Sequence, residues 1–183
     1  MTPSHTSVPQ RRFSNDGWLR CRCLSALLVG SVLILGGCEQ AADHSARLVA
    51  EGLSLAERGD NAGAFTRFEN ARTVDPSSSR GWVASAELAT DLGDYDRAEK
   101  EFSEAMRLDP DNVLWQQKRA EVRQMAGHSE RAKGDYSAVV KRDPSRSSAW
   151  YNRGSIHAVE GNLPQAHADI EQAFSRADTP AKR

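Results

Sequence analysis

Small and aromatic residues recur along this chain at intervals of 34 positions. One column consists of alanines, namely Ala64, Ala98, Ala132 and Ala166. A second column, four residues later, is aromatic in three copies and aliphatic in the last, namely Phe68, Phe102, Tyr136 and Ile170. Apolar residues spaced by three and four positions predict amphipathic helices. A period held over four copies without insertion predicts a stacked array of helical units.

Glycine and proline mark the ends of the predicted helices. A glycine lies where the chain must enter the left-handed region between the two helices of a unit, at Gly59, Gly93, Gly127 and Gly161. We expect the second helix to be capped by the residue after three of these glycines, namely Asp60, Asp94 and Asn162, and in the third copy by His128 or Ser129. Each second helix should stop at an Asp-Pro pair, because proline disfavours helical backbone in the residue before it; the prolines are Pro76, Pro110 and Pro144.

The first helix of each unit also carries a small residue that we expect to face the alanine column. These residues are Gly52, Ala86, Ala120 and Gly154. Two small residues in contact let a pair of helices cross closely, and the aromatic column would then fill the space beside the crossing.

Together these columns resemble the tetratricopeptide-repeat family. In that family an aromatic residue or Leu is followed four positions later by Gly or Ala, and then by a turn glycine, an alanine, an aromatic residue, a second alanine and a proline. The resemblance implies an all-α fold, a right-handed superhelical solenoid of four helix-turn-helix repeats. The expected repeats are about 45–78, 79–112, 113–146 and 147–180, which make a domain at 45–180 followed by a short tail at 181–183.

One column departs from the family pattern. The family usually has a large aliphatic residue three positions after the Trp82 place, whereas this chain has Glu51, Ser85, Arg119 and Arg153. The third unit also has the polar residues Gln116 and Arg123 at usually apolar places. We therefore expect its first helix to be rotated or less tightly packed.

The first 37 residues are typical of an export signal. Four arginines precede a 12-residue apolar run from Leu24 to Leu35, which is short for a membrane-spanning helix. The sequence Leu35-Gly36-Gly37-Cys38 resembles the bacterial lipobox, which implies a cleaved signal peptide at 1–37, a lipidated Cys38 and a short tether at 38–44. The competing interpretation is an uncleaved anchor with an incidental cysteine. Glu39 is not the Asp that marks inner-membrane retention, so the resemblance favours a lipoprotein of the outer membrane that faces the periplasm.

Composition offers little support for catalysis or nucleic-acid binding. The net charge is −1 and no basic patch occurs. Outside the N-terminal region the chain has no cysteine, and the histidines stand at different places in the repeats. No nucleophile motif, phosphate loop or paired carboxylates occur, and a metal pair at His157 and His167 lacks further ligands. We therefore expect a protein that is not an enzyme and has no cofactor or metal.

The family resemblance implies that residues of the first helices line a concave, peptide-binding surface. By register these are Val49, Leu53, Arg80, Val83, Glu87, Asp91, Leu114, Gln117, Lys118, Glu121, Met125, Tyr151 and Asn152. The groove is apolar with acidic residues, which suits an extended or helical peptide carrying apolar anchors and basic residues. For any single charged residue, keeping the surface soluble is an equally good explanation.

Two functions fit this sequence. One is a lipid-anchored scaffold that binds peptide segments of a cell-envelope complex, since repeat lipoproteins of this size resemble assembly factors of pili, including the tight-adherence type, and of secretion systems. The alternative is an adaptor that regulates a cell-wall or outer-membrane assembly enzyme. The last repeat has no covering helix, so Phe174 and Leu163 either lie on a more polar outer face or contact a partner or second copy. The oligomeric state stays open.

Overall fold

The computed structural model describes the backbone of residues 32–177 and the side chains of residues 39–176. This part of the chain contains eight helices and no strand. Their bounds are α1 Val32–Glu57, α2 Asn61–Val74, α3 Arg80–Asp91, α4 Tyr95–Leu108, α5 Val113–Met125, α6 Ser129–Arg142, α7 Ser147–Val159 and α8 Leu163–Ala177.

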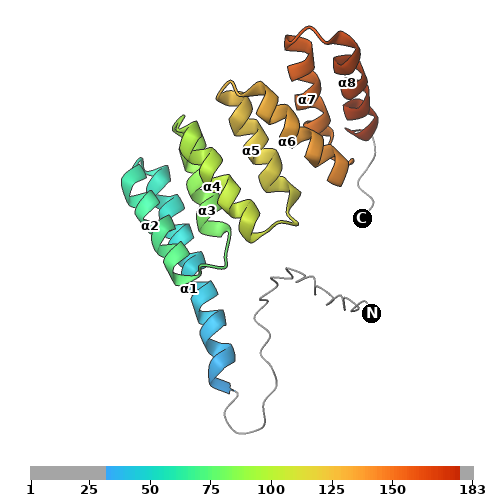
Figure 1. Ribbon diagram of the computed structural model, residues 1–183. Coiled ribbons are helices and arrows are strands. Elements are labelled where there is room, and N and C mark those ends of the chain that lie inside the picture. Colours follow the sequence, from blue (N-terminus) through green and yellow to red (C-terminus); the bar gives the residue numbers. More distant parts are fainter. Residues whose placement is uncertain (1–31, 178–183) are drawn as a thin grey trace, which may run out of the picture.

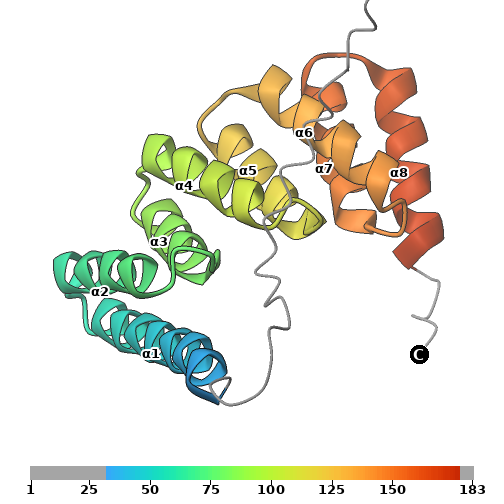
Figure 2. The same cartoon turned by 60° about the horizontal axis from the view of Figure 1, so that its bottom comes forward.

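The helices form four hairpins that follow one another along an arch (Figures 1 and 2). Within the described residues, the main contacts join helices that are neighbours in the chain, together with α1 and α3. The predicted all-α solenoid of stacked hairpins is therefore confirmed.

The turns inside the hairpins use the predicted glycines. Gly59, Gly93, Gly127 and Gly161 all have positive φ, between 76° and 83°. Asp60 and Asp94 cap the following helices, because the side chain of Asp60 accepts a hydrogen bond from the Gly63 amide and that of Asp94 from the Arg97 amide. The third copy differs, since His128 takes the N-cap position without a side-chain bond and Ser129 is already the first helical residue.

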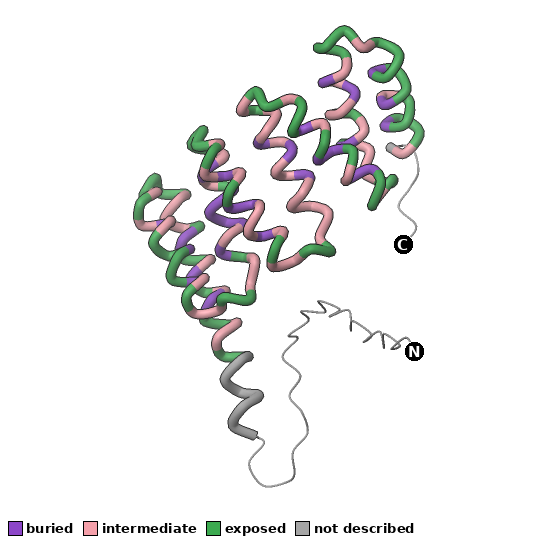
Figure 3. Tube along the Cα trace, in the orientation of Figure 1, coloured by how far each residue is buried: buried purple, intermediate pink, exposed green. Residues whose placement is uncertain are grey.

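The core consists of the small and aromatic columns found in the sequence. Ala64, Ala98 and Ala132 are fully buried, as are Phe68 and Tyr136. The close crossing is visible at Gly52, where an added Cβ would lie 2.5 Å from Cε1 of Phe68. Figure 3 shows the buried positions along the surfaces where helices face each other, while the turns inside the hairpins are mostly exposed.

The first helix begins earlier than the repeat pattern predicted. Residues Glu39 to His44, expected to form a tether, lie within α1, which begins at Val32. Neither glycine nor proline interrupts this stretch, and Ala41 and Ala42 favour helix. A helical segment rises about 1.5 Å per residue, so it spans less than half the length of the same residues in an extended chain.

The expected signal segment at 1–37 and the expected lipidation site Cys38 lie outside the residues whose side chains the structure describes. Among the described residues, no helix is both long enough and apolar enough to cross a bilayer.

Candidate functional site

A pocket of about 330 Å³ lies between α3 and α5, the first helices of two adjacent hairpins. Five predicted groove residues line it together with Thr90, namely Glu87, Asp91, Lys118, Glu121 and Met125. Two buried side chains, Phe102 of α4 and Val122 of α5, complete its wall. The structure thus brings the acidic residues of the predicted groove to one place, and we call it the α3–α5 pocket.

The rim of the α3–α5 pocket is negatively charged. Nζ of Lys118 lies 3.3 Å from Oε2 of Glu121, so these two charges offset each other. Glu87 and Asp91 are exposed and form no ion pair with the described part of the chain. Beside them, half of the Met125 side chain is accessible. The pocket therefore combines two available carboxylates with a flexible apolar surface, which suits a cationic and partly apolar ligand.

Two predicted groove residues are packing residues instead. Val83 is buried against Phe102 in the hydrophobic core, so it presents little surface to a ligand. Gln117 is buried as well, and its Nε2 donates to Oε1 of Glu121 at 3.0 Å and to Oγ of Ser148 at 3.1 Å. Gln117 therefore orients Glu121 and links α5 to α7.

The other predicted residues are distributed along the array. Leu53 and Arg80 are exposed, whereas Val49 is half-buried beside the Phe68 core and Leu114 is half-buried on α5. Tyr151 and Asn152 line a separate pocket of about 270 Å³ together with residues of α8. We call it the α7–α8 pocket; its other lining residues are Ser147, Ser148, Ala173 and Phe174.

A chain of polar contacts connects α5, α6 and α7. The hydroxyl of Tyr136 donates to Oε1 of Gln124 at 3.0 Å and accepts from Nδ2 of Asn152 at 3.3 Å. Burial raises the pKa of Tyr136, and the nearby charge of Glu121 adds to this effect. Tyr136 therefore stays neutral and acts as a fixed polar link rather than as an acid or base.

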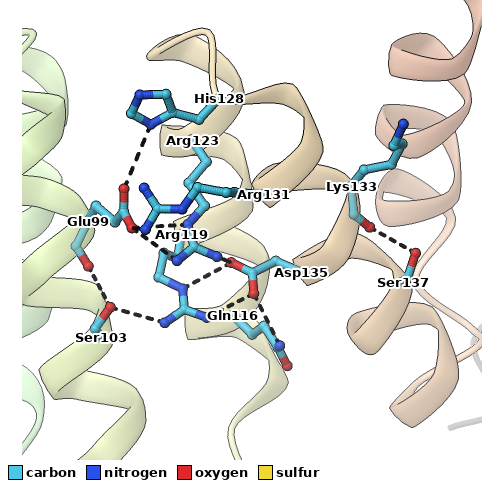
Figure 4. Close-up of polar contacts among 10 residues, drawn as sticks. All are labelled: Glu99, Ser103, Gln116, Arg119, Arg123, His128, Arg131, Lys133, Asp135 and Ser137. Carbon is cyan, nitrogen blue, oxygen red and sulfur yellow. Dashed lines mark hydrogen bonds and ion pairs between the residues drawn. The ribbon is translucent and has the colours of Figure 1, made fainter.

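The most extensive polar cluster was not predicted from the sequence. Arg119 of α5 donates to both carboxylate oxygens of Asp135, at 2.9 and 2.8 Å, and also to Oγ of Ser103, at 3.0 Å (Figure 4). Arg123 bridges Asp135 and Glu99, at 2.6 and 2.9 Å, and Arg131 also contacts Glu99. We call Glu99, Ser103, Arg119, Arg123 and Asp135 the α4–α6 polar network.

This network makes the third hairpin better packed than its sequence indicated. Because Arg119 and Arg123 are mostly buried and fully paired, α5 packs against α6 as extensively as α3 packs against α4. The expected loss of packing is therefore not seen when α5 and α6 are compared with α3 and α4, and the other expectation, a rotated first helix, stays a prediction. A sequence signal did exist, since the departing column at Arg119 and Arg153 is matched 16 residues later by Asp135 and Asp169.

The histidines and acidic residues of the described part of the chain do not gather into a metal site. No group of three or more His, Cys, Asp or Glu there could hold a metal ion. Nδ1 of His157 is buried and makes no hydrogen bond, with Oε2 of Glu160 3.8 Å away, and His167 is exposed beside Glu171.

Comparison with protein families matches the hairpins to a known repeat. Two family models described as tetratricopeptide repeat match residues 55–122 and 118–181, which together span most of the chain. The chain belongs to the tetratricopeptide-repeat family. Proteins of this family generally mediate protein–protein interactions, and their fold is typically a non-catalytic scaffold.

Solved structures of tetratricopeptide-repeat proteins share the fold. A crystal structure of MamA has a TM-score of 0.68 at 16% identity, covering 76% of this chain and 81% of that one. A tetratricopeptide-repeat protein from Parabacteroides merdae has a TM-score of 0.67 at 18% identity, and the match covers 78% of this chain and 56% of that one. The first repeat domain of Spaghetti (RPAP3), bound to the HSP90 peptide SRMEEVD, has a TM-score of 0.59 at 19% identity. The match covers 66% of this chain and 98% of that one. At these identities the likeness concerns the fold alone. A comparison with curated protein sequences finds no match.

Proposed function

We propose that this protein is a membrane-anchored interaction scaffold that binds a peptide segment of a cell-envelope complex in the α3–α5 pocket. The observation that carries the proposal is the combination of unpaired carboxylates at Glu87 and Asp91 with the exposed thioether of Met125 in one pocket. The peptide would carry an apolar side chain for the pocket, flanked by lysine or arginine. The structural neighbour that holds a peptide supports this use of the fold.

The membrane part of the proposal rests on the sequence. The apolar run and the lipobox-like ending at Cys38 favour acylation and attachment to the outer membrane, with the repeats facing the periplasm. The resemblance to repeat lipoproteins suggests a pilus or secretion complex as the setting. The α3–α5 pocket would then collect a segment of the assembling complex close to the bilayer.

Charge reversal in the pocket tests the proposal. The probes are labelled synthetic peptides with one central Leu or Met flanked by lysines, and the same peptides with glutamates instead. The full chain in detergent should bind the lysine series, and the double variant Glu87→Lys with Glu121→Lys should bind it at least tenfold more weakly. Fluorescence anisotropy measures both affinities.

A matched control separates the pocket from the overall charge. The variant Glu69→Lys with Glu104→Lys changes the net charge equally, but at residues that do not line the α3–α5 pocket. It should keep most of the affinity. Equal losses in the two double variants would show that binding follows net charge, and the pocket would be the wrong site.

A further inference from the structure

The last helix carries a stripe of exposed residues along one side. His167, Glu171 and Phe174 are spaced by four and three positions, so they lie on the same face of α8. The side chains of His167 and Glu171 are 75% and 68% exposed, and Phe174 is 65% exposed. The exposed phenylalanine beside Glu171 invites a comparison with the same positions of the other hairpins.

In the preceding hairpin the two outer positions of this stripe are covered by the next helix, while the middle one, Ser137, is exposed and accepts a hydrogen bond from Arg153 of α7. One repeat earlier, Lys133 of α6 is only 18% exposed and pairs with Glu160 at the end of α7, while Val140 is buried in a cluster with Ala149 of α7. Two repeats earlier, Glu99 of α4 is 14% exposed and pairs with Arg123 of α5. The exposed stripe on α8 is thus the surface on which a further first helix would pack.

The α7–α8 pocket lies on the same surface. Its exposed Tyr151 occupies the repeat position of Gln117, which is buried and bonded to Ser148 in the first turn of α7. By the same geometry, the α7–α8 pocket is the place for the first turn of an additional helix. We call Tyr151, His167, Glu171 and Phe174 the end face.

We propose that the end face binds an amphipathic helix from a different protein, lying parallel to α7, with an apolar side chain in the α7–α8 pocket and an arginine or lysine on Glu171. Glu171 stands at the repeat position of Ser103 and Ser137. The Oγ atoms of these serines accept hydrogen bonds from Nη1 of Arg119 and Arg153, at 3.0 and 3.1 Å. Inside the array, Asp135 and Asp169 neutralise these arginines. A single incoming helix brings no such aspartate, and Glu171 supplies the carboxylate instead.

Charge argues against a second copy of this chain as the occupant. If α1 of another copy packed on the end face in the same way, Glu51 would take the place of the arginine and meet Glu171. The two carboxylates would then lie side by side and repel each other.

A charge-swap experiment tests this proposal. The probe is a labelled, helix-stapled peptide with the sequence of residues 146–160, which contains α7 and Arg153. We expect the full chain in detergent to bind it, and Glu171→Arg and Phe174→Ala each to weaken binding at least tenfold. A peptide with Arg153→Glu should bind poorly to the unchanged protein and regain affinity for the Glu171→Arg variant.

The controls separate the end face from the α3–α5 pocket. The variant Glu87→Lys with Glu121→Lys should bind the helical probe normally, so this result and the peptide test of the pocket can fail independently. The proposal is overturned if the probe does not bind, or if Glu171→Arg and Phe174→Ala leave its affinity unchanged. It is also overturned if the protein dimerises and Phe174→Ala makes it monomeric, because the occupant would then be a second copy.

Discussion

Arg119 and Asp135 form an ion pair with two hydrogen bonds, and Arg153 and Asp169 repeat it one unit later. The second pair has N–O distances of 2.8 and 2.6 Å, and both aspartates are buried. These pairs replace the aliphatic contact that the family usually has at this place. They join the two helices of a hairpin and, through Ser103 and Ser137, attach each hairpin to the preceding one.

Breaking the first pair should be costly. We expect Asp135→Ala to lower the free energy of unfolding by about 3–5 kcal/mol, because Arg119 and Arg123 would stay buried without their shared carboxylate. Urea denaturation gives this value. The exposed pair Arg107–Glu104 is the control, and Glu104→Ala should change the free energy of unfolding by no more than about 1 kcal/mol. Similar results for the two variants would mean that the buried pair is not structurally important.

The pair should also be replaceable. Adding Arg119→Leu to Asp135→Ala removes one unpaired charge and restores the apolar residue typical of the family, so the double variant should be more stable than Asp135→Ala alone. The same denaturation series measures the coupling. A double variant that is less stable than the single one would contradict this explanation.

Two glycines should respond in opposite ways to alanine. Gly134 lies in the middle of α6 with no atom near an added Cβ, so Gly134→Ala should stabilise the protein by about 1 kcal/mol through helix propensity. In contrast, Gly52→Ala places a methyl group against the Phe68 ring and should destabilise it. Thermal unfolding distinguishes the two. A lowered melting temperature for Gly134→Ala would refute the first expectation.

The turn before α7 should lose stability in acid. The Ser145 hydroxyl donates to Oδ1 of Asp143 at 2.5 Å, and this bond, helped by the Ser145 amide and Arg146, lowers the pKa of Asp143. Because the folded pKa is below the unfolded value of about 3.9, this stabilisation is present above that pH and is lost as the pH falls through the folded pKa. Ser145→Ala should raise the Asp143 pKa in an NMR titration. An unchanged pKa would assign the shift to the backbone amide of residue 145 and to Arg146 instead.

Membrane attachment can be tested by replacing one cysteine. If Cys38 carries the lipid, Cys38→Ser should move the protein from the membrane fraction to the soluble fraction, while Cys21→Ser, inside the expected signal segment, should have no such effect. Fractionation and mass spectrometry of the mature N-terminus provide the measurement. A Cys38→Ser variant that stays in membranes would favour the uncleaved anchor.

The fold was predictable because its determinants are local. Gly93 before Asp94 and Asp109 before Pro110 each fix a helix boundary through backbone chemistry that needs no tertiary contact. The alanine and aromatic columns predicted the core for the same reason, since their spacing alone places them on one side of a helix.

The candidate site was only partly predictable because its side chains depend on the neighbouring hairpin. Register placed Glu87, Asp91 and Glu121 near one another, and the α3–α5 pocket contains all three. It could not show that Gln117 is turned toward Ser148, or that Tyr151 belongs to a different pocket. The partners of Arg119 were missed because polar departures were interpreted as lost packing, although the matching aspartate stands 16 residues later.

The order of contacts along the arch has a mechanical consequence. Because each hairpin is held mainly by its neighbours in the chain, a pulling force applied between α1 and α8 must pass through every junction in series. The junction that resists least would then open first, and the array would lengthen stepwise, one hairpin at a time.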